Sequence, residues 1–344
     1  MARPEAAGQD LKGWRELTLS LLREAPLEHA YHVPAIPYIR LRARFRAEEE
    51  AGLPGFKGSM LRGVFGHALR KAVCAMGPRQ RCESCSLRGP CVYTRIFETF
   101  IDGEPPPFLS GVATSPRPYV FEPRTAAREL AAGDLVETDL ILVGQACDLQ
   151  PFVLLVLERM AALGFGKRRS RFELAGVDYR AADGSWRTGY RQGGQRWPGS
   201  VAPLEAAVEE PASERLTLRF LTPTRIQKQG AVQESVSFRL LVFQMLRRVL
   251  ELAHFHVPGA EVDWEFRPLL DRTQDVRVTR SDLSWRELTR YSNRQRGKLP
   301  LGGFVGEMDL EGDLAPFLPL LRTAEVVHVG KGAAFGLGQV EVLG

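Results

Sequence analysis

A glycine-rich loop near the end of the chain has the composition of an anion-binding site. Four glycines and one lysine fall within residues 330–338, namely Gly330, Lys331, Gly332, Gly336 and Gly338. Glycine adopts positive φ and allows close approach to its backbone, so successive N–H groups can face an anion beside the lysine charge. A Walker loop would continue from Gly-Lys through Ser or Thr into a helix, and a dinucleotide-binding fingerprint would also open a helix. Here Gly332 follows Lys331 and an alternating strand follows the loop, so neither nucleotide-binding motif fits.

The cysteines have metal-ligand spacing. Four of the five lie within eighteen residues, at Cys74, Cys82, Cys85 and Cys91, whereas Cys147 stands alone in an apolar stretch. The chain begins without the apolar segment of a signal peptide, and disulfides are disfavoured in proteins that are not exported. Four thiolates suit a tetrahedral metal, usually zinc, with an iron–sulfur cluster or unliganded thiols as alternatives. Because a four-sulfur site leaves no open position, we expect a structural zinc and no catalytic metal.

Basic residues are concentrated in two short stretches, although the net charge is only +5 and the pI about 9.0. One stretch follows a Gly-x-Gly turn at residues 164–166, and the other precedes the glycine-rich loop. Such clusters are typical of a protein with a polyanionic partner, and a solvated charged surface is the alternative. The members are Lys167, Arg168, Arg169 and Arg171 in the first stretch, and Arg286, Arg290, Arg294, Arg296 and Lys298 in the second.

The length and composition are those of a globular protein of about two domains. The chain has 344 residues, of which 44% are hydrophobic. It has no run of about eighteen apolar residues, so we expect no membrane span. Without a signal peptide, we expect a cytoplasmic protein.

The first half contains the elements of a ferredoxin-like domain. Residues 39–46 alternate between apolar and arginine side chains, which predicts a strand, and a helical pattern follows Gly58. Two strands are expected near residues 117–122 and 135–143, then a helix at 151–163 and a strand at 172–177. This strand–helix–strand–strand–helix–strand order is the ferredoxin-like arrangement.

The second half repeats part of this pattern. Residues 181–213 lack periodicity and predict a linker or a surface excursion. A strand is then expected at 216–226, a long helix at 235–253, a strand at 301–310 and a short helix at 314–321. The segment at 148–152 (DLQPF) matches that at 313–317 (DLAPF), and each leads through a leucine-rich helix to a Gly-x-Gly turn.

We therefore predict an α+β protein with two ferredoxin-like (RRM-like) domains in tandem. The N-terminal domain spans residues 1–180, with a zinc-binding insertion at residues 74–91. Residues 214–344 form the second domain, which carries the glycine-rich loop.

The final loop resembles the C-terminal glycine-rich loop of the RAMP superfamily of CRISPR-associated RNA-binding proteins. Four further segments match by order and spacing, at residues 61–69 (LRGVFGHAL), 221–226 (LTPTRI), 291–295 (YSNRQ) and 301–306 (LGGFVG). The resemblance covers about residues 36–344 and is closest to the endoribonuclease that cuts CRISPR precursor RNA within its repeats. It implies the duplicated fold, and a product with a cyclic phosphate and a free 5′-hydroxyl.

Such a nuclease works without a metal, because the ribose 2′-hydroxyl is the nucleophile. It needs a base for the hydroxyl proton, a donor for the charged phosphorane and an acid for the leaving oxygen. His67 lies on the first helix, where the resemblance places a general base, and His328 lies two residues before the glycine-rich loop. Tyr291 and Lys298 are the other catalytic candidates. The remaining histidines are expected to be structural.

The resemblance also implies contact with CRISPR repeat RNA through the glycine-rich loop and the basic stretches. Lys331 is the best phosphate contact, and arginine forks suit phosphate oxygens and guanine edges. The alternatives are a non-catalytic crRNA-binding subunit of a CRISPR effector complex and a zinc-stapled protein with no RNA role. The expected RNA contacts are Gly330, Lys331, Gly332, Gly336, Gly338, Lys167, Arg168, Arg169, Arg171, Arg294 and Arg296.

Overall fold

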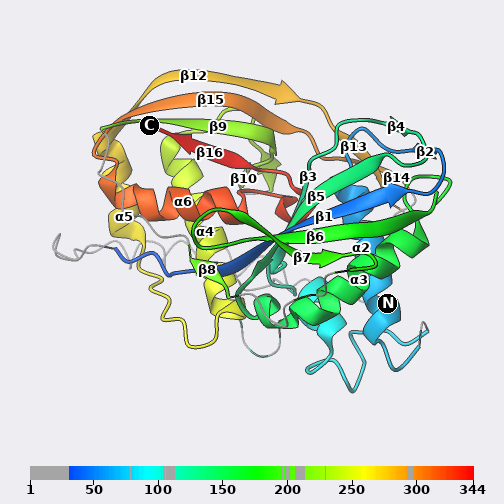
Figure 1. The fold of residues 1–344 in the computed structure, drawn as a ribbon. Helices are drawn as coiled ribbons and strands as arrows, with labels where there is room; N and C mark the ends of the chain where they lie inside the picture. Colours follow the sequence, from blue (N-terminus) through cyan, green and yellow to red (C-terminus); the bar gives the residue numbers. More distant parts are fainter. Residues whose placement is uncertain are drawn as a thin grey trace, which may run out of the picture.

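The computed structural model describes most of the chain from residue 31 onward. The described residues are 31–77, 79–101, 103, 105, 113–194, 197, 202–205, 214–228, 230–292 and 297–344. His29, Arg294 and Arg296 lie outside them. Figure 1 shows two β-sheets side by side, each with its helices packed against one face. No helix in the described part of the chain has the length and apolarity that a membrane span requires.

The first sheet has ferredoxin-like topology, as the sequence predicted. Its strands run antiparallel in the order β3-β5-β1-β6, which is the order 2-3-1-4 along the chain. β7 extends the sheet beside β6. The elements are β1 (Pro37–Ala47), α2 (Gly58–Val73), β3 (Tyr119–Pro123), β5 (Leu135–Val143), α3 (Gln150–Leu163), β6 (Phe172–Arg180) and β7 (Trp186–Arg191).

The alternation in β1 divides the two faces of this sheet. Ile39, Leu41, Ala43 and Phe45 point toward α2 and α3 and are buried. α2 meets them with a stripe of residues at helical spacing that includes Leu61 and contacts α3. The strand and the helix therefore share one apolar core.

The opposite face of the first sheet is lined with ion pairs. The arginines of β1 meet carboxylates on β3, β5 and β6, so the positive charge of this face is neutralised. Arg42, for example, donates two hydrogen bonds to Asp139, of 2.7 and 3.0 Å. The paired residues are Arg40 with Glu122 and Asp139, Arg42 with Asp139, Arg44 with Glu137 and Asp178, and Arg46 with Glu173.

The second sheet repeats the topology, with the antiparallel order β12-β15-β9-β16. The sequence pattern did not reveal β12, because it is an edge strand whose side chains are mostly exposed. The elements are β9 (Arg215–Thr224), α4 (Phe238–His256), α5 (Arg267–Asp271), β12 (Val276–Arg286), β15 (Gly303–Gly312), α6 (Leu318–Val327) and β16 (Val340–Leu343).

The two cores join at the edge of the first sheet. Val120, Ile141 and Val143 of the first domain pack into the apolar core of the second.

Short strands lie between the main elements, and the segment 181–213 contributes two strands, β7 and β8, where a linker or excursion was expected. The short strands are β2 (Ala51–Gly52), β4 (Glu129–Leu130), β8 (Leu204–Glu205), β10 (Gln227–Lys228), β11 (Ala231–Val232), β13 (Thr289–Ser292) and β14 (Gly297–Pro300).

The cysteine-rich insertion lies between α2 and a π-helical turn, η1 (Thr94–Glu98). Cys74, Cys82, Cys85 and Cys91 all line one cavity of about 190 Å³. Among the described residues, however, no three His, Cys, Asp or Glu side chains are arranged to hold a metal ion. The structure thus gathers the four thiols around one space without forming a metal site, and structural zinc stays a prediction.

Candidate active site between the two domains

A large cavity lies where α2 of the first domain meets the β13–β14 hairpin of the second. Its volume is about 570 Å³. Figure 1 shows the hairpin reaching from the second sheet toward the first domain. The lining residues are Pro54, Phe56, Ser59, Met60, Gly63, Val64, His67, Leu163, Gly164, Gly166, Arg169, Thr289 and Arg290.

His67 is an exposed side chain on the wall that α2 contributes to this cavity. Partial desolvation lowers the pKa of its imidazole, and the positive charges of Lys71 and Arg169 lower it further. The ring is therefore largely neutral at neutral pH and can accept a proton. Exposure, position and pKa together suit a general base.

The Gly-x-Gly turn of the first domain supplies the adjoining wall. Gly164 has φ 78° and Gly166 has φ 79°, and a Cβ on either would lie 2.3 Å from a backbone carbonyl oxygen. Only glycine fits these two positions. The Gly166 N–H points at Sδ of Met60 on α2 at 3.3 Å, which fixes the turn beside the helix.

The cations of this turn lie on the surface beside His67. Lys167, Arg168, Arg169 and Arg171 are all exposed. Arg169 lines the cavity and is close enough to act on the His67 ring. The turn thus brings one predicted cation into the cavity, whereas Lys167, Arg168 and Arg171 are exposed and do not line it.

The β13–β14 hairpin brings the backbone of two catalytic candidates, Tyr291 and Lys298, near the cavity. Thr289 and Arg290 line it, and Tyr291 is the next residue, paired in the hairpin with Lys298. The side chains of Tyr291 and Lys298 lie outside the described residues. Their catalytic role stays a prediction that the backbone position permits.

The glycine-rich loop packs against the first domain. A Cβ on Gly336 would lie 2.2 Å from the carbonyl oxygen of Phe121, and a Cβ on Gly58 of α2 would lie 1.7 Å from that of Phe335. The loop includes a short 3₁₀ turn, η6 (Ala333–Phe335). Glycine therefore serves here to bring two backbones together across the domain boundary.

Much of the loop backbone is already hydrogen-bonded within the protein. The Lys331 amide donates to the Arg225 carbonyl at 2.9 Å, and the Gly338 amide donates to the Pro223 carbonyl at 3.1 Å. Gly336 and Gly338 are buried, and close backbone packing accounts for glycine at these two positions. Lys331, in contrast, is exposed. RNA contact by Gly330, Lys331 and Gly332 stays a prediction.

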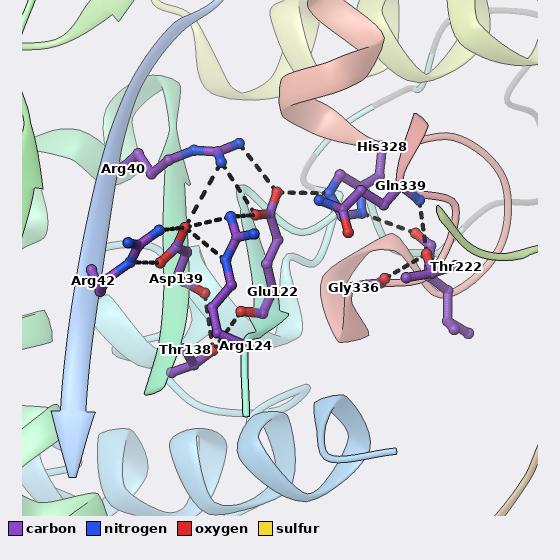
Figure 2. Close-up of polar contacts among 11 residues, drawn as sticks. Arg40, Arg42, Glu122, Arg124, Thr138, Asp139, Thr222, His328, Gly336 and Gln339 are labelled. Atoms are coloured by element: carbon purple, nitrogen blue, oxygen red, sulfur yellow. Dashed lines mark hydrogen bonds and ion pairs between the residues drawn. The ribbon is translucent and has the colours of Figure 1, made fainter. Parts of the chain in front are cut away.

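His328 lies in the domain interface and not in the cavity. Its side chain is fully buried, with Nδ1 3.1 Å from the Leu337 carbonyl oxygen and Nε2 3.0 Å from Oε1 of Glu122 (Figure 2). Both ring nitrogens thus have a partner inside the protein. His328 was predicted as a catalytic candidate, but its side chain is buried in the domain interface and does not line the cavity, because the residues beside the loop pack against the first domain.

Glu122 joins His328 to the arginines of the first sheet, a role that no sequence pattern indicated. Its carboxylate pairs with Arg40 at 3.1 Å and Arg124 at 2.8 Å. Burial acts to raise its pKa, but the hydrogen bond and charge of His328 and the two arginines outweigh it and lower the pKa to about 2. The network fixes the two domains that form the cavity walls.

Two known family models match this chain, one over each of the two domains of the fold. A family model described as the AF_1859 N-terminal domain matches residues 36–201, and the model of CRISPR-associated endoribonuclease Cas6 matches residues 218–340. No curated protein matches the sequence.

Solved structures share the fold over most of the chain. A Cas6 product complex is 18% identical over 89% of this chain and 100% of its own, with a TM-score of 0.55. Thermus thermophilus Cas6 is 17% identical over 90% of this chain and 99% of its own, with a TM-score of 0.50. A chain of a partial Cas6-RT-Cas1–Cas2 complex is 13% identical over 90% of this chain and 46% of its own, with a TM-score of 0.52.

At these identities the structures establish a shared fold, and the family model adds a match in sequence over most of the second domain. The RAMP resemblance of the final loop and the duplicated ferredoxin-like topology agree with both. The second domain thus matches the model of CRISPR-associated endoribonuclease Cas6 in sequence, and the chain shares the fold of solved Cas6 structures over most of its length.

Proposed function

We propose that this protein is an endoribonuclease that cuts CRISPR precursor RNA within its repeats, and that the cavity beside α2 is its active site. The observation that carries the proposal is the position of His67. It is exposed, its pKa is lowered, and it shares an open cavity with Arg169 and Arg290. The Cas6 family-model match over the second domain and the shared Cas6 fold support the class of reaction, and the cavity supports the choice of residues.

The reaction needs no metal at the scissile phosphate. Neutral His67 takes the proton of the ribose 2′-hydroxyl, whose oxygen attacks the adjacent phosphorus. As the new O2′–P bond forms, Arg169 stabilises the negative charge on the phosphorane. The P–O5′ bond then breaks, and the leaving oxygen takes a proton to give a 5′-hydroxyl and a 2′,3′-cyclic phosphate. Tyr291 and Lys298 are the candidate acids, since their hairpin borders the cavity.

Cleavage of a labelled repeat RNA in EDTA tests this function. We expect one cut per repeat between about pH 6 and 9, which brackets the titration range of histidine. A set of repeats with a single 2′-deoxy nucleotide at each position in turn is the matched control. Only the substitution at the nucleotide that supplies the nucleophile should abolish the cut. Binding without any cleavage would favour the non-catalytic RNA-binding subunit.

A structural zinc in the insertion and a CRISPR effector complex as partner are further parts of the proposal. The shared cavity of the four cysteines supports the zinc, which would hold the insertion against the end of α2. One structural relative lies in a complex with Cas1 and Cas2, so we propose that this protein also has protein partners.

A further inference from the structure

Two arginines from different domains share one aromatic ring beside the cavity. The guanidinium of Arg62, on α2, lies 5.1 Å from the centre of the Phe335 ring, and that of Arg290, on β13, lies 5.0 Å from it. Arg62 also lies over the ring of Phe97 at 4.4 Å. The side chains of Arg62, Phe335 and Arg290 are half-buried. Arg62 and Arg290, which share the ring of Phe335, are called the arginine pair below.

The arginine pair lacks the carboxylates that neutralise other arginines of the fold. Those of β1 meet carboxylates of the first sheet, and Arg219 of the second sheet meets Glu307 and Glu341. Among the described residues, no carboxylate forms an ion pair with Arg62 or Arg290. Within this part of the chain, Nε of Arg290 is also buried without a hydrogen-bond partner. A bound anion would supply the charge that no described carboxylate supplies here.

The stacking geometry leaves the arginines ready for such a partner. A guanidinium lying against a ring uses its flat face, so the N–H groups at its edge stay available for oxygen atoms. The two positive charges repel each other, and the cation–π contacts with the ring offset that repulsion only in part. Burial and the charge of Arg62 accordingly lower the pKa of Arg290. An anion between the two arginines would relieve the repulsion.

We propose that Arg62 and Arg290 together hold one phosphodiester group of the bound RNA, next to the group that is cut. Arg290 also lines the cavity that contains His67, so a strand in the cavity passes the arginine pair within one or two nucleotides. The contact crosses the domain boundary, because Arg62 comes from the first domain and Arg290 from the second. Phe335 orients both arginines and does not contact the RNA. This inference rests on the proposed function and adds a specific subsite to it.

The test measures binding of a repeat RNA made uncleavable by 2′-deoxy substitution. Arg62→Gln and Arg290→Gln should each weaken binding about tenfold, as loss of one charge-assisted contact to phosphate would. The double variant should lose much less than the hundredfold product, because both arginines hold the same group. The slope of log Kd against log salt should fall by about 0.7, the value for one phosphate on a single strand.

Matched variants separate this site from a general loss of charge or fold. Arg277→Gln removes the same charge from the outer edge of the second sheet, where Arg277 is exposed, and should leave affinity and salt slope unchanged. Arg62→Lys and Arg290→Lys keep the charge without the planar fork and should recover part of the affinity. Circular dichroism confirms that each variant is folded.

Several outcomes would overturn the subsite. Losses no larger than that of Arg277→Gln would show that the pair does not contact RNA. Losses that multiply in the double variant would show two separate phosphates. If the wild type cuts RNA while the pair has no effect on binding, the subsite fails and the proposed function stands. If the pair binds as expected but no RNA is cut, the proposed activity fails and the subsite stands.

Discussion

His328 and Glu122 form a buried pair that joins the two ferredoxin-like domains. Their side chains are 0% and 2% exposed, and Nε2 of His328 lies 3.0 Å from Oε1 of Glu122. The pair lies between the glycine-rich loop and the charged face of the first sheet (Figure 2). Because the cavity walls come from both domains, we infer that this contact sets the distance between His67 and the β13–β14 hairpin.

Loss of the Glu122 carboxylate should destabilise the protein strongly. Glu122→Ala leaves Arg40 only its 3.8 Å contact with Asp139 and removes the partner of His328 Nε2. Breaking a buried pair in this way costs about 3–5 kcal/mol. Urea unfolding measures the loss. Glu173→Ala removes the partner of the exposed Arg46 and should cost less than about 1 kcal/mol. Equal losses in the two variants would contradict a special role for the buried pair.

Acid should release the same contact. The pKa of Glu122 is lowered from 4.5 to about 2 in the folded protein, so its ionised form stabilises the fold above the unfolded value. This contribution is lost as the pH falls from about 4.5 toward 2. Unfolding midpoints across this range should fall more steeply for the wild type than for Glu122→Gln. Parallel curves would show that another group controls acid stability.

The pH dependence of cleavage should report the lowered pKa of His67. If the neutral ring is the base, kcat/KM rises with pH through the pKa of the free enzyme, and this rise should lie below the ordinary value of 6.5. Lys71→Gln removes one of the charges that lower the pKa and should move the rise to higher pH. An unchanged profile in that variant would exclude His67 as the titrating group.

The cysteine-rich insertion should contain one zinc per chain. Elemental analysis of the purified protein measures the metal, and removal by a strong chelator should lower the melting temperature. Cys82→Ser and Cys85→Ser should lose the metal, whereas Cys147→Ser should keep it. Cleavage by folded, metal-free protein should persist, because four protein ligands leave no position for the substrate. Metal-free protein of unchanged stability would argue for unliganded thiols.

The sequence predicted most of the fold because buried faces impose periodicity. The alternation of residues 39–46 and the leucine-rich helices helped to predict the order of elements along the first domain and the internal repeat. The sequence pattern did not predict β12 and β7, because both lie at sheet edges and β12 buries few side chains. An edge strand without a buried face has no apolar alternation to detect.

The site was predictable where neighbours in sequence determine it. His67 and Arg169 lie on a helix and a glycine turn that the local pattern revealed, and the structure brings them to one cavity. The burial of His328 was not predicted, because its environment depends on Glu122, which is 206 residues away in the sequence. The Arg62–Phe335–Arg290 cluster depends likewise on contacts between domains, which no local pattern encodes.

Cleavage of repeat RNA by His67→Ala tests the central claim most directly. A positioned base contributes about 10²–10⁴-fold to such a reaction, so the variant should lose at least about a hundredfold in single-turnover rate. Its affinity for RNA should match that of the wild type. His254→Ala, which removes an exposed histidine from α4, should cut normally. Cutting by His67→Ala at the wild-type rate, with the same products, would contradict the assignment of the active site.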